Sequence, residues 1–164
     1  MKAWKRFVRE QGGWAAYGGI IFKGDRVLLR KPTNNFGGYA WTFPKGAKNR
    51  DETPEEAAVR ETYEETGYVC QIVGKVPGIF QGTSSTTEFW IMTPVSQEEI
   101  PINPELGFPE TERIAWADYN TAQRLIAQTG QLGNQPGMQR DLEILDAAFK
   151  AKGLPIAENE PEEE

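Results

Sequence analysis

The chain has 164 residues, a length that suits one domain with a sizeable buried core. Hydrophobic residues make up 38% of it and charged residues 26%, a composition typical of globular proteins. The net charge is −6, but five glutamates lie in residues 153–164 and the rest of the chain carries only −1, which excludes a globally basic nucleic-acid surface. The absence of histidine excludes catalytic triads and zinc sites built on that residue.

Cysteine usage and the N-terminus both point away from secretion. Cys70 is the single cysteine, so an intramolecular disulfide is excluded. The first residues lack the apolar stretch of a signal peptide, and no run approaches transmembrane length. We therefore expect a cytoplasmic protein without a membrane partner.

The N-terminal part of the sequence predicts strands. Residues 15–22 and 26–30 are rich in β-forming residues and are separated by Lys23-Gly24-Asp25, so they predict a hairpin. Residues 31–38 form a turn-rich loop, and a short strand is expected at Tyr39–Phe43.

A helix over residues 54–66 has explicit start and stop signals. Thr53 is the expected N-cap, Pro54 occupies the first helical position and Glu56 completes a capping box. Gly67 is the expected stop.

The C-terminal half predicts three further strands and two helices. The strands are expected at 68–80 (with a bend at Pro77-Gly78), 86–95 and 113–116, and the helices at 119–128 and 136–151. The last helix carries an apolar stripe that is expected to pack in the core: Met138, Leu142, Leu145 and Phe149.

This order of elements indicates a mixed sheet with helices packed on it. We expect a single domain over residues 1–152, followed by an acidic, disordered tail over residues 153–164.

Three carboxylates on the 54–66 helix are candidates for metal chemistry. Glu61, Glu64 and Glu65 stand at positions i, i+3 and i+4, so they share one face and repel one another. Glu64 and Glu65 also lie in the last turn, where the helix dipole disfavours negative charge. A bound hard cation reverses these penalties, and oxygen ligands select Mg²⁺, Mn²⁺ or Ca²⁺. The alternative is a solvated acidic face on a surface helix.

Two flanking features favour the metal interpretation. Arg60 lies beside the carboxylates and Glu52 lies upstream, so an ion pair between them would anchor the start of the helix. The segment Trp41–Gly46 ends in a tight turn where the carbonyl of Gly46 can approach a metal, because glycine has no side chain in the way.

The segment 46–68 resembles the Nudix box. The pattern of that box is Gly, five residues, Glu, seven residues, Arg-Glu, an aliphatic residue, any residue, Glu-Glu, any residue, Gly and an aliphatic residue. Thr62 and Tyr68 stand where aliphatic residues are usual. The fixed positions are all present: Gly46, Glu52, Arg60, Glu61, Glu64, Glu65 and Gly67.

The resemblance covers residues 14–150 and implies a fold and a metal site. Nudix domains are α/β/α sandwiches with a mixed β-sheet. By analogy Glu61, Glu64, Glu65 and the carbonyl of Gly46 would bind Mg²⁺, with Mn²⁺ as a substitute. Arg60 and Glu52 would form the supporting ion pair. Metal ions would neutralise the diphosphate and align a water for in-line attack at phosphorus.

Many members of the family use one more glutamate from a later loop. Glu110 is the candidate, because it stands six residues before Trp116, as in the similar segment of diadenosine tetraphosphate hydrolases. Glu105 and Glu112 are alternatives, and Glu88 on a predicted strand ranks below them.

The substrate stays open at this point. Trp41–Gly46 is similar to the segment before the box in diadenosine tetraphosphate and diphosphoinositol polyphosphate hydrolases, and Lys45 would suit a polyphosphate. Arg30 and Lys31 would add positive potential. Phe80, Phe89 and Trp90 are candidates for stacking on a base, with core packing the expected role of at least two of them. Ile114 stands where those enzymes have an aromatic residue two positions before the tryptophan, which weakens adenine stacking there.

Three functions are consistent with the sequence. The leading one is Mg²⁺-dependent hydrolysis of a pyrophosphate bond in a nucleoside diphosphate linked to another moiety, such as a dinucleoside polyphosphate. The second is hydrolysis of ADP-ribose or nucleoside diphosphate sugars, and the third is an inactive Nudix-fold binding module. The expected partner is a small nucleotide or polyphosphate, with no stable nucleic-acid partner; a homodimer stays open.

Overall fold

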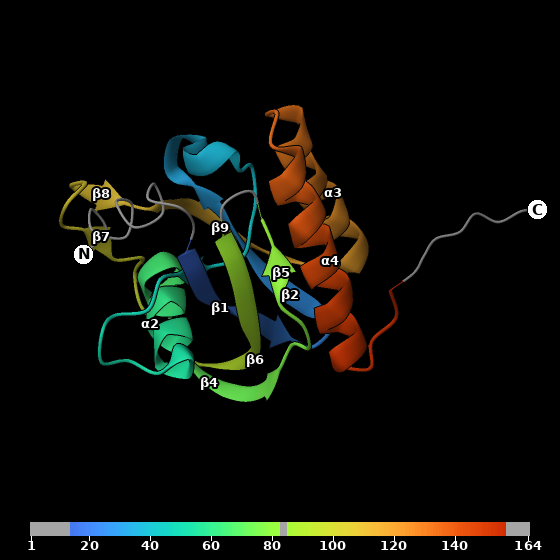
Figure 1. The fold of residues 1–164 in the computed structure, drawn as a ribbon, viewed down its shortest axis with the longest axis horizontal. Coiled ribbons are helices and arrows are strands. Elements are labelled where there is room, and N and C mark those ends of the chain that lie inside the picture. Colours follow the sequence, from blue (N-terminus) through green and yellow to red (C-terminus); the bar gives the residue numbers. More distant parts are fainter. Residues whose placement is uncertain (1–13, 83–84, 157–164) are drawn as a thin grey trace, which may run out of the picture.

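The computed structural model describes residues 14–82 and 85–156. Within them, seven strands form a mixed sheet in the order β4-β6-β1-β2-β9, with β3 paired to β1 and β5 to β6. β1 and β6 are parallel and the other pairs are antiparallel. Helix α2 covers one face and helices α3 and α4 cover the other (Figure 1). The predicted α/β/α sandwich with a mixed sheet is confirmed.

The first hairpin follows the prediction closely. β1 (Trp14–Lys23) and β2 (Arg26–Pro32) are joined at Gly24, whose φ of 61° glycine adopts without strain. Side chains alternate along β1: Ile20 packs toward the α3–α4 layer and Ile21 toward α2. The sheet therefore has a hydrophobic core on each face.

The segment between β2 and α2 differs from the prediction. Residues Thr33–Gly38 form 3-10 turns, η1, in which Asn34 and Asn35 have positive φ. The strand expected at Tyr39–Phe43 was wrong, since only Thr42 bridges to Arg30 and the regular strand is β3 (Lys45–Gly46).

Helix α2 (Pro54–Thr66) has the predicted bounds. The side chain of Thr53 accepts a hydrogen bond from the backbone N–H of Glu56, and the side chain of Glu56 accepts one from Thr53, so the capping box is confirmed. Gly67 ends the helix with a φ of 80°.

The remaining strands depart from the prediction mainly at loops. The bend expected at Pro77-Gly78 is confirmed: it separates β4 (Tyr68–Lys75) from β5 (Phe80–Gln81), with Gly78 at a φ of 111° between them. β6 spans Ser85–Gln97 and β9 spans Thr111–Ala117. A small hairpin of β7 (Ile102–Asn103) and β8 (Phe108–Pro109) was not predicted.

Two helices complete the described chain. α3 spans Tyr119–Gln131 and α4 spans Gln135–Ala151, close to the predicted bounds. Leu154 and Ile156 pack against the core, so the expected start of the tail at residue 153 is too early; residues 157–164 lie outside the described residues.

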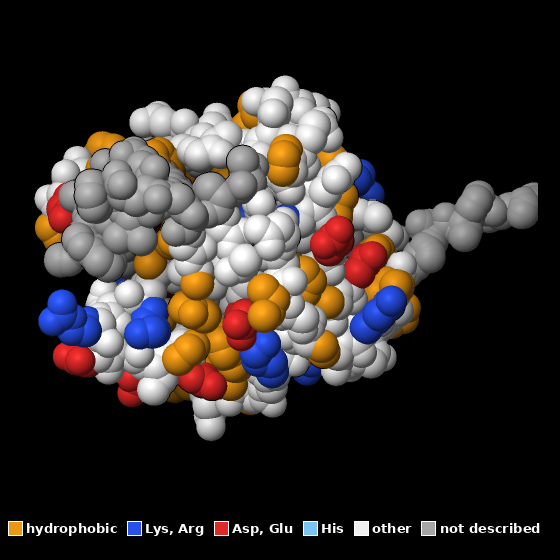
Figure 2. All heavy atoms as spheres, viewed as in Figure 1, with side chains coloured by type: hydrophobic (Ala, Val, Ile, Leu, Met, Phe, Trp, Pro, Cys, Tyr) orange, Lys and Arg blue, Asp and Glu red, His pale blue; other side chains and the backbone are white. Residues whose placement is uncertain are grey.

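The surface has no basic face in the view of Figure 2, where Lys and Arg side chains lie among Asp and Glu side chains. Among the described residues, no helix has the length and apolar character needed to span a membrane.

Candidate functional site

Arg60 is the centre of the carboxylate cluster on α2. Its guanidinium donates two hydrogen bonds to Glu52, from Nε (2.5 Å) and Nη2 (2.8 Å). Nη1 donates to Glu61 Oε2 at 3.0 Å and to Glu64 at 3.3 Å, and Nη2 also donates to the Ala47 carbonyl at 3.0 Å. One arginine thus fixes the loop before the helix and two of its carboxylates.

The carboxylates that contact Arg60 differ in burial and in electrostatic environment. The Arg60 hydrogen bond holds the pKa of Glu52 below its ordinary value. Glu61 is fully buried, whereas the Glu64 side chain is 34% exposed. Burial of Glu61 is tolerated because Arg60 pairs with it.

Glu65 contacts β2 and β3. Its Oε1 accepts a hydrogen bond from the backbone N–H of Lys45 at 3.1 Å and lies 3.5 Å from Arg30 Nη1. Arg30 also donates from Nε to Thr111 at 2.6 Å and from Nη2 to the carbonyl of Glu110 at 2.9 Å. Arg30 therefore ties α2 to the loop that carries Glu110.

The donor atoms around Gly46 suit a hard divalent cation. A Cβ at position 46 would lie 2.1 Å from Cδ of Glu61, so only glycine lets this backbone lie against that carboxylate. Carboxylate and carbonyl oxygens are the ligands that Mg²⁺ and Mn²⁺ prefer. In residues 14–82 and 85–156, however, no three His, Cys, Asp or Glu side chains already converge on one metal position. Metal binding would require carboxylates now held by Arg60 or Lys45 to turn.

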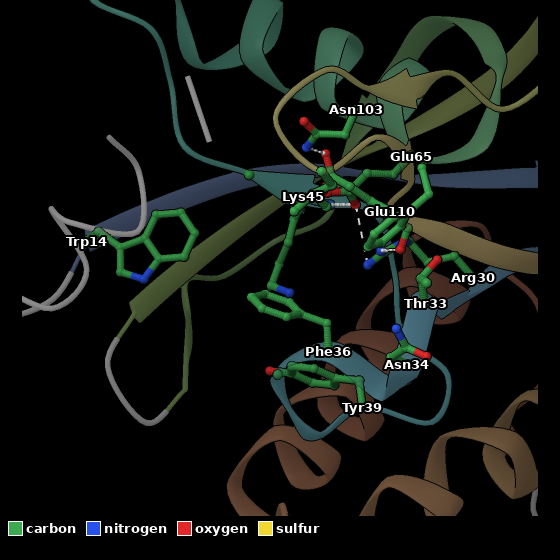
Figure 3. A pocket seen from close by; sticks show the side chains of 14 residues that line it. Trp14, Arg30, Thr33, Asn34, Phe36, Tyr39, Lys45, Glu65, Asn103 and Glu110 are labelled. Atoms are coloured by element: carbon green, nitrogen blue, oxygen red, sulfur yellow. Dashed lines mark hydrogen bonds and ion pairs between the residues drawn. The ribbon is translucent and has the colours of Figure 1, made fainter. Parts of the chain in front are cut away.

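A pocket of about 250 Å³ opens beside this cluster. Five of the predicted site residues line the pocket: Arg30, Lys45, Gly46, Glu65 and Glu110. Figure 3 shows Arg30, Glu65, Glu110 and Asn103 gathered at one end, with the Lys45 side chain reaching toward Phe36 and Tyr39 at the other.

Glu110 is the loop glutamate that the structure brings to the pocket. The side-chain amide of Asn103 on β7 donates to Glu110 Oε2 at 2.9 Å. Glu105 and Glu112 are exposed and are not among the lining residues, and Glu88 pairs with Lys75 at 3.4 Å.

The stacking role expected of Phe80 does not fit its position. Phe80 is 8% exposed and belongs to the core on the α3–α4 face, as does Phe89, and neither lines the pocket. Trp90 is also buried. The aromatic and apolar side chains that line it are Trp14, Phe36, Tyr39, Leu106 and Phe108.

Sequence reasoning missed these pocket residues for identifiable reasons. Phe36 and Tyr39 lie in a stretch read as a turn-rich loop and a strand, and Asn103 and Phe108 belong to the unpredicted hairpin. The signal available in the sequence was the position of two phenylalanines among turn-forming residues; in the structure Phe36 is 57% exposed and Phe108 41%.

Lys45 sits in a strongly charged environment. Burial, together with the positive charges of Arg140 and Arg30, lowers the pKa of Lys45 to about 7, against the opposing effect of Asp141 and Glu65. Its Nζ lies 5.0 Å from the centre of the Tyr39 ring. An anionic ligand would favour the charged form of this lysine.

A family model described as the NUDIX domain matches residues 14–135. The chain belongs to the Nudix family. Thr62 and Tyr68, the two departures from the Nudix box, are both buried: Tyr68 packs edge-on against Trp116, and the Thr62 hydroxyl has no hydrogen-bond partner among the described residues.

Curated relatives match over short stretches. The chain is 43% identical over 60 residues to an RNA pyrophosphohydrolase of Xylella fastidiosa (strain Temecula1), which covers 32% of this Nudix chain and 32% of that protein. The match thus spans about a third of the relative's length.

Solved structures match over most of the fold. A NUDIX hydrolase from Nitrosomonas europaea has a TM-score of 0.66 at 17% identity, covering 88% of this chain and 93% of that one. A Caenorhabditis elegans Ap4A hydrolase has a TM-score of 0.58 at 20% identity, covering 84% and 98%. At these identities the similarity shows the Nudix fold. Nudix hydrolases generally use divalent metals.

Proposed function

We propose that this Nudix protein hydrolyses a pyrophosphate bond in a nucleoside diphosphate linked to another moiety, with a dinucleoside polyphosphate or related nucleotide as substrate and Mg²⁺ as cofactor. The observation that carries the proposal is the pocket beside the Nudix box, whose lining combines charged and aromatic side chains. Lys45, Glu65 and Glu110 supply the charges, and Phe36 and Phe108 supply aromatic surface.

This combination matches the two parts of a nucleotide. Its phosphates would bind Lys45, a compact point charge. Its base would lie against the exposed phenylalanines, which offer stacking surface. A diphosphoinositol polyphosphate has many phosphates and no base, so it fits this lining less well, with Arg30 and Lys45 the cations among the lining residues.

Each site residue has a separate task in the proposed reaction. When bound, Mg²⁺ supplies neutralisation of the diphosphate charge and a lowered pKa for water. Glu61, Glu64, Glu65 and the Gly46 carbonyl would hold it, with Mn²⁺ as substitute. Arg60 and Glu52 orient these carboxylates.

Glu110 would take the proton of the attacking water. Asn103 holds its Oε2, and Arg30 and Thr33 hold its backbone carbonyl, so its position is fixed from three sides. Water attacks phosphorus in line, the anhydride P–O bond breaks, and the phosphate leaving group departs with the bonding electrons. Each of the three nitrogen atoms of the Arg30 guanidinium has a protein partner. We therefore assign Arg30 to positioning this loop.

The test is a substrate panel with a matched pair of variants. Wild type is incubated with Mg²⁺ and dinucleoside polyphosphates, ADP-ribose, nucleotide sugars, nucleoside triphosphates or a diphosphoinositol phosphate, and products are separated by chromatography. Metal-dependent cleavage should collapse in Glu64→Gln and persist in Glu55→Gln, which changes an exposed glutamate of the same helix. Cleavage of none of these by wild type, with Mg²⁺ or Mn²⁺, would contradict the proposal and favour a binding module.

A further inference from the structure

The wall of the pocket is held by the opposite helical layer. Residues 37–42 run from η1 toward β3 across the ends of α3 and α4, and Gly37 and Tyr39 line the pocket. Four side chains of the α3–α4 layer form hydrogen bonds with this segment. Thr129 accepts from the Ala40 N–H (3.0 Å) and donates to the Trp41 carbonyl (3.4 Å), and Asn134 donates to the Gly37 carbonyl (3.3 Å). Arg140 donates to the Tyr39 hydroxyl (2.7 Å), and Asp141 accepts from the Thr42 hydroxyl (2.6 Å).

A buried ion pair forms the centre of these contacts. Arg140 is 3% exposed and Asp141 is 1% exposed, and Asp141 Oδ1 accepts from Arg140 Nε at 3.2 Å and from Nη2 at 3.1 Å. Burying two charges is costly, and it gives at best a weak gain in stability over an apolar pair. Both residues also lie beyond residues 14–135, so they are not part of the matched family domain.

The guanidinium of Arg140 is confined. A Cβ at position 82 would lie 2.7 Å from Arg140 Nη1, so Gly82 leaves the space that this group occupies. With Asp141 at Nε and Nη2 and the Tyr39 hydroxyl at Nη2, Arg140 has one well-defined orientation. A rigid donor of this kind fixes the ring that it contacts.

Tyr39 connects this pair to the pocket. Its hydroxyl accepts the Arg140 hydrogen bond, and its ring centre lies 5.4 Å from Arg140 Cζ and 5.0 Å from Lys45 Nζ. A cation within about 6 Å of an aromatic ring centre is attracted by the ring. The ring thus touches the buried arginine on one element and the pocket lysine on another.

We propose that Arg140 is a positioning residue for phosphate binding: it fixes Tyr39 through the hydroxyl, and the Tyr39 ring seats the Lys45 ammonium in the pocket. The inference rests on the phosphate-binding role of Lys45 in the proposed function. It adds that the C-terminal helix α4, through a residue that lines no part of the pocket, sets substrate affinity.

The chain offers a matched control for the Tyr39 hydroxyl. Tyr119 on α3 donates from its hydroxyl to Asp146 on α4 at 2.5 Å. Tyr39→Phe and Tyr119→Phe therefore each remove a phenol hydroxyl that bonds to a side chain of α4, but only Tyr39 lines the pocket. A general loosening of the α4 contacts would affect both variants alike.

The experiment measures binding of inorganic tripolyphosphate by calorimetry with EDTA present, so that neither a metal nor hydrolysis contributes. Lys45→Met should weaken binding most. Tyr39→Phe should weaken it about three- to tenfold, and Tyr119→Phe less than about twofold. Equal effects of the two tyrosine variants would overturn the proposal, as would failure of the wild type to bind tripolyphosphate.

A double-mutant cycle separates positioning from direct contact. If Tyr39 acts through Arg140, adding Tyr39→Phe to Arg140→Gln should weaken binding by less than about twofold further. A full, additive Tyr39→Phe effect in that background would show that the hydroxyl contacts the ligand itself, and would overturn the role of Arg140. Absence of hydrolysis in the substrate panel would contradict the proposed enzyme activity without touching these binding results.

Discussion

The α2 layer and the α3–α4 layer both hold residues at the pocket, through interactions of different range in the sequence. Arg60 in α2 bonds to partners between 1 and 13 residues away. The bonds from α3 and α4 to residues 37–42 span between 88 and 101 residues. The contacts of Arg60 with its carboxylates can therefore form within their own segment, whereas the pocket wall exists only once the whole domain has folded.

The charged side chains of the two layers also differ in how deeply they are buried. Arg60 and Glu64 are partly exposed, so the Glu64 carboxylate can turn toward a ligand. Arg140 and Asp141 are almost completely buried and have one arrangement. We infer that the first layer serves the chemistry and the second fixes the shape of the binding surface.

The largest expected effect is on stability, in the α3–α4 layer. Arg140→Met leaves the buried Asp141 carboxylate without a positive charge to pair with, so we expect the free energy of unfolding to fall by about 3–5 kcal/mol. Urea titration measures this. Arg124→Met on α3, which removes an exposed arginine, is the control and should change little. A loss below about 1 kcal/mol for Arg140→Met would show that the layer does not depend on the pair.

The next effect concerns the close approach of Gly46 to Glu61 in the α2 layer. Gly46→Ala would place a methyl group 2.1 Å from Cδ of Glu61, so the carboxylate must move. We expect kcat/KM for the best substrate to fall by about a hundredfold. The control is Gly74→Ala in β4, where a Cβ meets Ile91 at 3.8 Å, an ordinary contact. Equal activity of the two variants would contradict the placement of Glu61 in the site.

A smaller effect of opposite sign is expected inside the α2 layer. The buried hydroxyl of Thr62 has no hydrogen-bond partner among the described residues. Thr62→Val keeps the shape and removes this penalty, so the free energy of unfolding should rise by about 1 kcal/mol. Thr66→Val is the matched comparison, because Thr66 donates to the Thr62 carbonyl at 2.6 Å and should lose stability when changed. Chemical denaturation of both variants measures these two changes in the free energy of unfolding.

The smallest expected effect is a pH dependence of stability, which comes from the ion pair between Glu52 and Arg60. The Arg60 hydrogen bond lowers the pKa of Glu52 in the folded state, so Glu52 stabilises the fold above its unfolded pKa of about 4.3. That contribution is lost as the pH falls through the lower, folded-state pKa. The stability difference between wild type and Glu52→Gln should therefore shrink from pH 6 toward pH 3. A constant difference in urea titrations across this range would contradict the ion pair.

The same contrast explains what the sequence could predict. Thr53, Glu56 and Gly67 act within one helix, so α2 was predicted with its observed bounds. The Nudix box is equally local, and Arg60 indeed contacts Glu52, Glu61 and Glu64. Long, periodic elements such as α4 were also found.

The missed features depend on contacts between distant residues. The β7–β8 hairpin has two-residue strands with no usable period, and Tyr39 is held at the pocket by Arg140, which lies 101 residues away in the sequence. One signal was present. Asp141 lies on the buried face of α4, at helical spacing from Gly137, Ile144 and Ala148, and a charge on such a face predicts a buried polar contact.

The most direct test of the division between the two layers is to measure kcat and KM separately for Glu64→Gln and Lys45→Met on the best substrate of the panel. The account predicts that Glu64→Gln lowers kcat by at least about a hundredfold with KM nearly unchanged. Lys45→Met should instead raise KM about tenfold and retain most of kcat. The opposite pattern, with kcat controlled by Lys45 and KM by Glu64, would contradict the assignment of chemistry to α2 and of binding to Lys45, whose ammonium lies beside the Tyr39 ring of the wall.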